Sequence, residues 1–327
     1  MNSVRGGTTE TPTPQVLGRY QIRAPIGAGS TGEVFRAHDP ELDRTVAIKV
    51  LRSPFAGDLQ LRKQLVREAK AISALSHHHI CATYDIGCQD AVDYVVMEHL
   101  EGKTLADRLQ EEPLQHWEVD MIVRSIAEAL SHAHGRGVVH RDLKPANIFI
   151  VDDDQCVKVL DFGLSITHAC TSAASQASSA SPYIAPEQLE GKETDARTDI
   201  FSFGAVLFEM MTGKKAVKGQ SVPIAVSMRL DRPDPNARPA DESTLCPALA
   251  CLIAKCLAPE PAARWQSIED LREGWERVSV APNLFGDEPP HFRTYPRSTH
   301  SSSATIRSLV FWLCFFLLGL VLMHPGC

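Results

Sequence analysis

Hydrophobic positions in the first third of the chain alternate with polar ones at the two-residue period of β-strands. These runs are rich in β-branched and aromatic residues, and turn residues separate them. One stretch, 59–76, has a helical period instead, with apolar residues at 61, 65, 69, 72 and 75. The pattern predicts a small antiparallel β lobe with one helix, and its five strands are expected at 20–24, 33–37, 46–50, 80–86 and 92–97.

The pattern becomes mainly helical from Leu105 onward. The longest helix is expected at Trp117–Gly135, where apolar residues share one face and a glycine ends the run. Two short strands, 148–151 and 157–160, interrupt the helices. A second, larger and mainly helical lobe is therefore predicted, so the fold class is α+β, and its later helices are expected at 199–213, 245–256 and 268–278.

The two ends of the chain differ from the middle in composition. Residues 1–18 are rich in glycine, threonine and proline and predict a disordered leader. No apolar stretch precedes Val16, so no signal peptide is expected. Residues 280–308 are a Pro/Ser-rich linker, which leaves 19–279 as the folded domain.

The last stretch, 309–323 (LVFWLCFFLLGLVLM), is apolar throughout, unlike an amphipathic surface helix. As a helix it is about 22 Å long, against about 30 Å for a bilayer core. Local thinning of the bilayer absorbs that mismatch at modest cost. A C-terminal single transmembrane helix is predicted in preference to a helix docked on the domain. Arginines at 293, 297 and 307 precede the run and no Lys or Arg follows it, which predicts a single-pass cell-membrane protein with its folded domain in the cytoplasm.

Net charge and cysteine usage exclude several classes of function. The net charge is -7 and no run of Lys or Arg occurs, so no nucleic-acid partner is expected. The nine cysteines are odd in number, scattered and never in a C-x-x-C pair. Neither a disulfide framework nor a zinc site is indicated, and the folded domain is expected in a reducing environment.

Candidate chemistry is concentrated in the octapeptide 140–147 (HRDLKPAN). Asp142 and Asn147 lie five residues apart with Lys144 between them, which suits one loop that activates a hydroxyl and holds a metal ion. Asp161 begins an Asp-Phe-Gly turn fourteen residues past Asn147, directly after a strand-like run. The ordered pair of motifs is a far more specific signal than either motif alone.

A glycine-rich segment, 27–32 (GAGSTG), lies between the first two predicted strands. Glycines let a backbone approach phosphates closely, and the amides between them bind phosphate oxygens. Dinucleotide-binding folds use the same spacing, but there the third glycine opens a helix. Here a strand follows, and then a further strand with Lys49, which favours a nucleotide-binding hairpin.

These motifs together resemble the protein kinase family, in particular bacterial-type serine/threonine kinases, from about Tyr20 to Val278. The resemblance implies a bilobal protein kinase fold that uses ATP with Mg²⁺, for which Mn²⁺ can substitute. It implies protein substrates with serine or threonine acceptors. It is also compatible with a homodimer in which one copy phosphorylates the other.

The resemblance also implies roles for individual residues. Asp142 orients the acceptor hydroxyl, Lys144 stabilises the γ-phosphate, and Asn147 and Asp161 hold magnesium. Lys49 grips the nucleotide phosphates and pairs with an acid on the helix at 59–76, for which Glu68 is the candidate. Met97 is the gatekeeper, and the backbones of Glu98 and Leu100 pair with adenine. The nucleotide-binding set is Ile26, Gly27, Ala28, Gly29, Ser30, Gly32, Val34, Ala47, Lys49, Met97, Glu98 and Leu100.

Further family features concern the support of this site. Asp199 is expected to brace the catalytic loop, and Arg264 is expected to pair with Glu187. The segment 165–181 is rich in hydroxyl groups and is expected to autophosphorylate, with the phosphate paired to Arg141. One position departs from the family pattern, because Ala180 stands where serine/threonine kinases usually carry a threonine.

Two alternatives qualify this interpretation. A membrane-bound pseudokinase scaffold is disfavoured because Lys49, Asp142, Asn147 and Asp161 are all present, and only Ala180 speaks for it. A metal site at 77–79 (His-His-His) is disfavoured because three consecutive residues cannot converge on one ion from regular structure. The histidines are interpreted as the turn after the helix.

Overall fold

The computed structural model describes residues 15–29, 32–51, 68, 71–90, 92–152, 156–162, 181–216, 245 and 247–280. All of them belong to one compact unit, Met1–Gly286. The remaining unit, Asp287–Cys327, lies outside the described residues and contains the predicted membrane segment 309–323. Within the described part of the chain, no helix combines the length and the apolar character needed to cross a bilayer.

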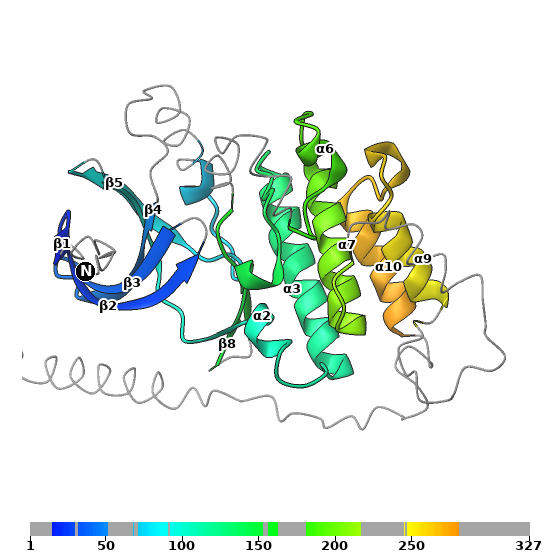
Figure 1. The fold of residues 1–327 in the computed structure, drawn as a ribbon, viewed down its shortest axis with the longest axis horizontal. Coiled ribbons are helices and arrows are strands. Elements are labelled where there is room, and N and C mark those ends of the chain that lie inside the picture. Colours follow the sequence, from blue (N-terminus) through cyan, green and yellow to red (C-terminus); the bar gives the residue numbers. More distant parts are fainter. Residues whose placement is uncertain are drawn as a thin grey trace, which may run out of the picture. The chain divides into compact units, whose positions relative to one another are not determined.

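The first sheet is antiparallel with strand order β1-β2-β3-β4-β6-β5 (Figure 1). Each of the five predicted strands has a counterpart in it, although the strand predicted at 80–86 begins later, at Thr83. The strands are β1 Val16–Leu17, β2 Tyr20–Gly29, β3 Gly32–Asp39, β4 Arg44–Leu51, β5 Thr83–Gln89 and β6 Val92–Glu98.

The sixth strand, β1, lies inside the stretch predicted to be a disordered leader. Leu17 pairs with Tyr20 across the β1–β2 turn and is only 2% exposed. Gly18 makes this turn possible with a left-handed φ of 58°. The folded domain therefore begins before residue 19, because one buried leucine anchors a strand too short to show a period.

Strand β4 lies at the centre of the sheet and carries Lys49. Val46 to Lys49 are all buried, since apolar clusters cover both faces of the strand. Tyr20, Ile48 and Val96 pack together on one face. On the other face the core continues through Leu51 and Val95 into the helical part of the domain. Lys49 is 5% exposed, so its ammonium group requires an anionic partner.

A second antiparallel sheet consists of β7 Gly102–Thr104, β8 Ile148–Val151 and β9 Val157–Val159. The predicted strands at 148–151 and 157–160 are confirmed, and β7 is an addition to them. Ile80 forms an isolated parallel bridge with Val159. Strand β9 is therefore tied to the segment that enters β5 and, through Leu160, to the turn at Asp161.

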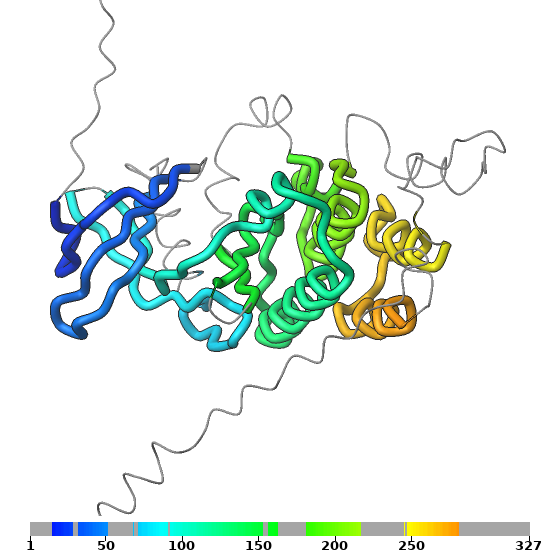
Figure 2. Tube along the Cα trace, turned by 90° about the horizontal axis from the view of Figure 1, so that it is seen from below, coloured from blue at the N-terminus to red at the C-terminus, as the bar shows by residue number. Residues whose placement is uncertain are grey.

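The helices pack against one another beside this second sheet, as Figure 1 and the turned view in Figure 2 both show. The longest predicted helix is confirmed as α3, with Gly135 as its C-cap. Helix α7 begins after the N-cap Asp195 and ends at Gly213, whose φ of 64° is left-handed. The helices are α2 Leu105–Arg108, α3 His116–His134, α6 Pro186–Leu189, α7 Ala196–Thr212, α9 Pro247–Cys256 and α10 Ile268–Ser279.

Helices α7 and α9 make their close contact at Gly204. A Cβ atom at this position would lie 2.4 Å from Cβ of Cys256, which real atoms do not tolerate. The glycine is therefore required for this packing distance rather than for its backbone angles.

Candidate active site

The loop His140–Asn147 is held from the helical side by the buried carboxylate of Asp199. The backbone amides of His140 and Arg141 donate to its two oxygens, each at 2.8 Å. His134 Nε2 lies 2.8 Å from the same carboxylate, which has no exposed surface. Arg141 adopts a left-handed φ of 66°, which is uncommon for a residue other than glycine. The predicted bracing role of Asp199 is confirmed.

His140 joins this loop to the turn at Asp161. Its Nε2 lies 2.8 Å from the carbonyl oxygen of Leu160, and its ring packs on Phe162 at a centroid distance of 4.6 Å. The amide of Leu160 donates to the carbonyl of Asn147 at 2.8 Å. Asp161 is thereby fixed relative to the loop, and its φ of 58° directs the chain away from β9.

The polar groups of the octapeptide converge on Asp142. Lys144 Nζ donates to Asp142 Oδ2 at 2.6 Å. Asn147 Nδ2 donates to the carbonyl oxygen of Asp142 at 2.8 Å and to its Oδ2 at 3.1 Å. The 3-10 turn Pro145–Asn147, which begins at Pro145, lets the side chain of Asn147 fold back onto Asp142. The result is a carboxylate of fixed orientation beside a lysine, with side chains 17% and 21% exposed.

Lys49 forms its ion pair with Asp161, at 2.6 Å between Nζ and Oδ2. Glu68 instead lies 3.5 Å from Arg141 Nη1. The predicted Lys49–Glu68 ion pair is thus not the arrangement of the structure. The left-handed turn at Asp161 brings a carboxylate to the buried ammonium group, while the long side chain of Arg141 reaches Glu68.

Strand register brings most of the predicted nucleotide-binding residues together. Val34 pairs with both Gly27 and Lys49, and Ala47 pairs with Met97. Gly32 is required at the turn of the hairpin, because a Cβ there would lie 1.9 Å from the carbonyl oxygen of Val50. Gly29 pairs with Gly32 at the end of β2, next to Ala28. Ser30 lies outside the described residues, as does Ala180.

The remaining predicted residues lie on β2, at the end of β6 and directly after it. Ile26 is 48% exposed on β2, and Leu100 follows β6. Glu98 donates its amide to the carbonyl of Ala82 at 2.9 Å, and its carboxylate accepts from Lys158 at 3.0 Å. A small pocket is lined by Ile72, Cys81, Thr83, Met97, Asp161 and Phe162.

Glu187 and Arg264 form the buried ion pair predicted between them. Two parallel hydrogen bonds of 2.7 Å join the guanidinium to the two carboxylate oxygens. Burial alone would raise the pKa of Glu187, but the hydrogen bonds from Arg264 and Thr198 outweigh it and hold that pKa below its usual value. Three backbone carbonyls accept the other guanidinium protons, so Arg264 is fully satisfied.

Several contributors to the site are absent from the sequence-based prediction. His134, the last residue of α3, bonds to Asp199. Thr194 Oγ1 accepts from Arg141 Nε at 3.1 Å, and Gln188 Nε2 donates to the carbonyl of Arg141 at 2.8 Å. No local pattern marks these residues, because their partners lie 47 to 65 positions away.

The donor set fits a hard divalent cation and a nucleotide. Asp161 and Asn147 offer carboxylate and amide oxygens, the ligands that Mg²⁺ takes in proteins. Lys49 and Lys144 lie within 2.6 Å of Asp161 and Asp142 respectively, and each lysine can turn to a phosphate.

Comparison with known proteins identifies relatives over most of the chain. A family model described as protein kinase domain matches residues 20–275. The serine/threonine-protein kinase PknB of Mycolicibacterium smegmatis is 36% identical over 276 residues, which is 81% of this chain and 44% of that protein. The serine/threonine-protein kinase PrkC of Bacillus subtilis is 36% identical over 260 residues, or 79% of this chain and 40% of that protein.

Solved structures give the same result for the fold. The PknI kinase domain of Mycobacterium tuberculosis superimposes with a TM-score of 0.63 at 27% identity, covering 80% of this chain and 97% of that domain. The curated relatives are longer, however, and the chain spans 39–44% of the length of those it matches.

Proposed function

Because the chain belongs to the protein kinase domain family, we propose that it is a serine/threonine protein kinase that transfers the γ-phosphate of Mg-ATP to protein hydroxyl groups. The observation that carries this proposal is the convergence of Lys144 and Asn147 on the carboxylate of Asp142, in a loop whose Asn147 carbonyl binds the amide of Leu160, directly before the Lys49–Asp161 pair. The named serine/threonine kinases among its relatives support the choice of acceptor.

The geometry assigns a task to each residue. Asp142 is held by two donors, so its carboxylate is oriented to accept the proton of the attacking hydroxyl. Lys144 lies beside that carboxylate and can turn toward the transferred phosphate to neutralise its developing charge. Mg²⁺ would be held by Asn147 and Asp161, where it supplies electrostatic stabilisation of the phosphates.

The adenine end of the nucleotide would meet the segment after Met97. The backbone amide of Glu98 already donates to the carbonyl of Ala82. The backbone carbonyl of Glu98 would therefore be the group that accepts a hydrogen bond from the amino group of adenine. Lys49 would reach the phosphates from β4, on the buried side of the glycine-rich hairpin β2–β3.

We also propose that phosphorylation of the segment 165–181 activates the enzyme. Arg141 is 35% exposed and lies 3.5 Å from Glu68, so a phosphate near it would compete for the guanidinium. Glu68 would then be released to pair with Lys49, the arrangement that the family resemblance implies. Trans-autophosphorylation by a second copy is the simplest source of that phosphate. Mass spectrometry of active enzyme should find phosphate on this segment, and full activity with an unmodified segment would refute the regulatory claim.

The location proposed for the enzyme is the cell membrane. The apolar run 309–323 and the arginines that precede it support a single-pass anchor with the kinase domain in the cytoplasm. The full chain should sediment with membranes and resist carbonate extraction, whereas a version that ends at Ser303 should remain in the supernatant. Recovery of the full chain from the soluble fraction would contradict the anchor.

The central test is transfer of radiolabelled phosphate from ATP, with magnesium and a generic basic protein as acceptor. Asp142→Ala should retain nucleotide binding and lower transfer by orders of magnitude. Asp161→Ala should weaken magnesium-nucleotide binding as well, because it removes a metal ligand and the partner of Lys49. A wild-type chain that binds nucleotide without transfer would instead establish the scaffold alternative, for which Ala180 is the one supporting residue.

A further inference from the structure

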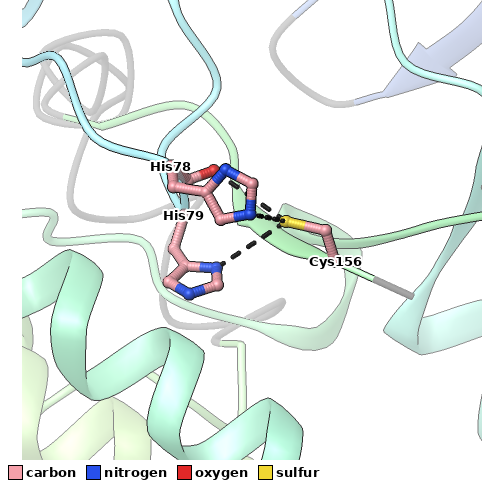
Figure 3. Close-up of side chains that lie close together, drawn as sticks. All are labelled: His78, His79 and Cys156. Carbon is pink, nitrogen blue, oxygen red and sulfur yellow. Dashed lines mark hydrogen bonds between the residues drawn. The ribbon is translucent and has the colours of Figure 1, made fainter. Parts of the chain in front are cut away.

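A cluster of nitrogen and sulfur donors lies outside the proposed active site, at His78, His79 and Cys156 (Figure 3). His78 Nε2 is 3.2 Å from Cys156 Sγ, and His79 Nδ1 is 3.8 Å from the same sulfur. One ligand atom from each residue lies within 4.8 Å of the other two. Cys156 is buried and carries a thiol, while His78 is exposed to solvent. The cluster is therefore accessible from one side.

Backbone hydrogen bonds hold the two segments of this cluster together. The amide of Val159 donates to the carbonyl of His79 at 2.9 Å, and the amide of Cys81 donates to the carbonyl of Val159 at 3.0 Å. Cys156 stands directly before β9, so it is placed opposite the histidines by the same pairing. The position of the donors thus depends on strand pairing and not on the side chains alone.

The remaining histidine of the run, His77, is not part of the cluster. The ring of His77 packs against His132 at a centroid distance of 4.8 Å. The expectation that three consecutive histidines do not converge on one ion is thus consistent with the structure. The third donor is a cysteine 77 residues away from His79, which no sequence spacing could indicate.

A second layer of contacts orients His79. Its Nε2 lies 3.6 Å from Glu128 Oε2, and its Nδ1 lies 2.8 Å from the carbonyl oxygen of Val157. For Nδ1 to bind a metal ion, its hydrogen bond to the Val157 carbonyl must break, and the ring proton then moves to Nε2 and faces Glu128. Imidazoles that ligate metals commonly donate their other nitrogen to a carboxylate in this way.

We propose that His78, His79 and Cys156 bind one Zn²⁺ ion, with water as the fourth ligand. For Zn–S near 2.3 Å and Zn–N near 2.05 Å, a tetrahedral site has a sulfur-to-nitrogen separation of about 3.6 Å. The two observed separations, 3.2 and 3.8 Å, lie on either side of that value. A donor set of two imidazoles and one thiolate suits Zn²⁺ and does not suit Mg²⁺. On binding, the thiol proton is released to solvent.

The site would join the turn before Ile80 to the strand that leads to Asp161. Metal binding would reinforce the contact between β9 and residues 79–81, which two backbone hydrogen bonds already join as a parallel bridge. Because the ion binds only the folded chain, it should raise the thermal unfolding midpoint. The proposal is independent of the kinase reaction and concerns a structural ion.

The test uses the full chain in mild detergent, first treated with a chelator and then titrated with Zn²⁺ against a chromophoric competitor. The wild type should bind one Zn²⁺ with high affinity, and Co²⁺ in its place should show a thiolate charge-transfer band. Cys156→Ser and His78→Gln should each lower the affinity at least about tenfold, and Cys156→Ser should abolish the cobalt band. The rise in the unfolding midpoint with Zn²⁺ should disappear in both variants.

Matched controls are Cys251→Ser, an exposed thiol on α9, and His38→Gln on β3, which should both bind as the wild type does. Because His78 is exposed, its variant keeps the fold even if replacement of the buried Cys156 does not. Failure of the wild type to bind stoichiometric Zn²⁺, or unchanged affinity in His78→Gln, would overturn the proposal. A cobalt complex without a thiolate band would also overturn it.

Discussion

Replacement of Arg264 by methionine should destabilise the domain more than almost any other single change in the helical lobe. Arg264 is 1% exposed and donates two hydrogen bonds of 2.7 Å to Glu187. Its other protons satisfy the carbonyls of Arg197, Ala258 and Pro259. The variant leaves a buried carboxylate without its guanidinium partner, although the hydroxyl of Thr198 still donates to it.

The expected loss follows from that uncompensated charge. Removal of one partner of a buried ion pair costs about 3–5 kcal/mol. For a domain of this size, each kcal/mol lowers the unfolding midpoint by about 2–4 °C, so a decrease of about 6–20 °C is expected. Differential scanning fluorimetry at pH 7 measures this directly. Glu187→Leu should cost a similar amount, and the double variant should lose about 2–3 kcal/mol less than the sum of the two.

The same pair predicts a pH dependence with a definite sign. Because the pKa of Glu187 is held below its ordinary value of 4.5, the pair contributes stability that is fully present above pH 4.5. That contribution is lost as the pH falls through the lowered pKa. The wild-type midpoint should therefore fall more steeply below pH 4.5 than that of the double variant. Additive losses in the two single variants, or a loss below about 1 kcal/mol in either, would refute this account of the pair.

Two further substitutions test other parts of the fold. Gly204→Ala should lower the free energy of unfolding by about 1–3 kcal/mol, because the new methyl group would overlap the side chain of Cys256. A thermal unfolding midpoint equal to that of the wild type would show instead that α7 and α9 can move apart at little cost. Asp199→Asn should keep the domain folded but lower phosphate transfer. One of the two backbone amides that donate to Asp199 would then face an NH₂ group, so one of the hydrogen bonds that orient the catalytic loop is lost. A transfer assay and a melting curve of the same variant distinguish this effect from unfolding.

Local pattern was sufficient for much of this domain. The strands and long helices follow from period, and Gly213 and Gly135 mark helix ends because their capping role depends on neighbours within one turn. Asp142, Lys144 and Asn147 share a short loop, so their convergence required only one turn at Pro145. The family resemblance then supplied long-range pairs such as Glu187–Arg264, which the structure confirms.

Tertiary structure decided what no local pattern contains. Lys49 could meet Glu68, 19 positions away, or Asp161, 112 positions away, and the turn at Asp161 selected the second. Strand β1 exists because Leu17 finds a buried place in the core, although two residues carry no measurable period. Cys156 meets His78 and His79 only because β9 pairs beside residues 79–81. Periodicity records which face of an element is buried, whereas the partner of a charged or metal-binding side chain depends on how distant elements pack.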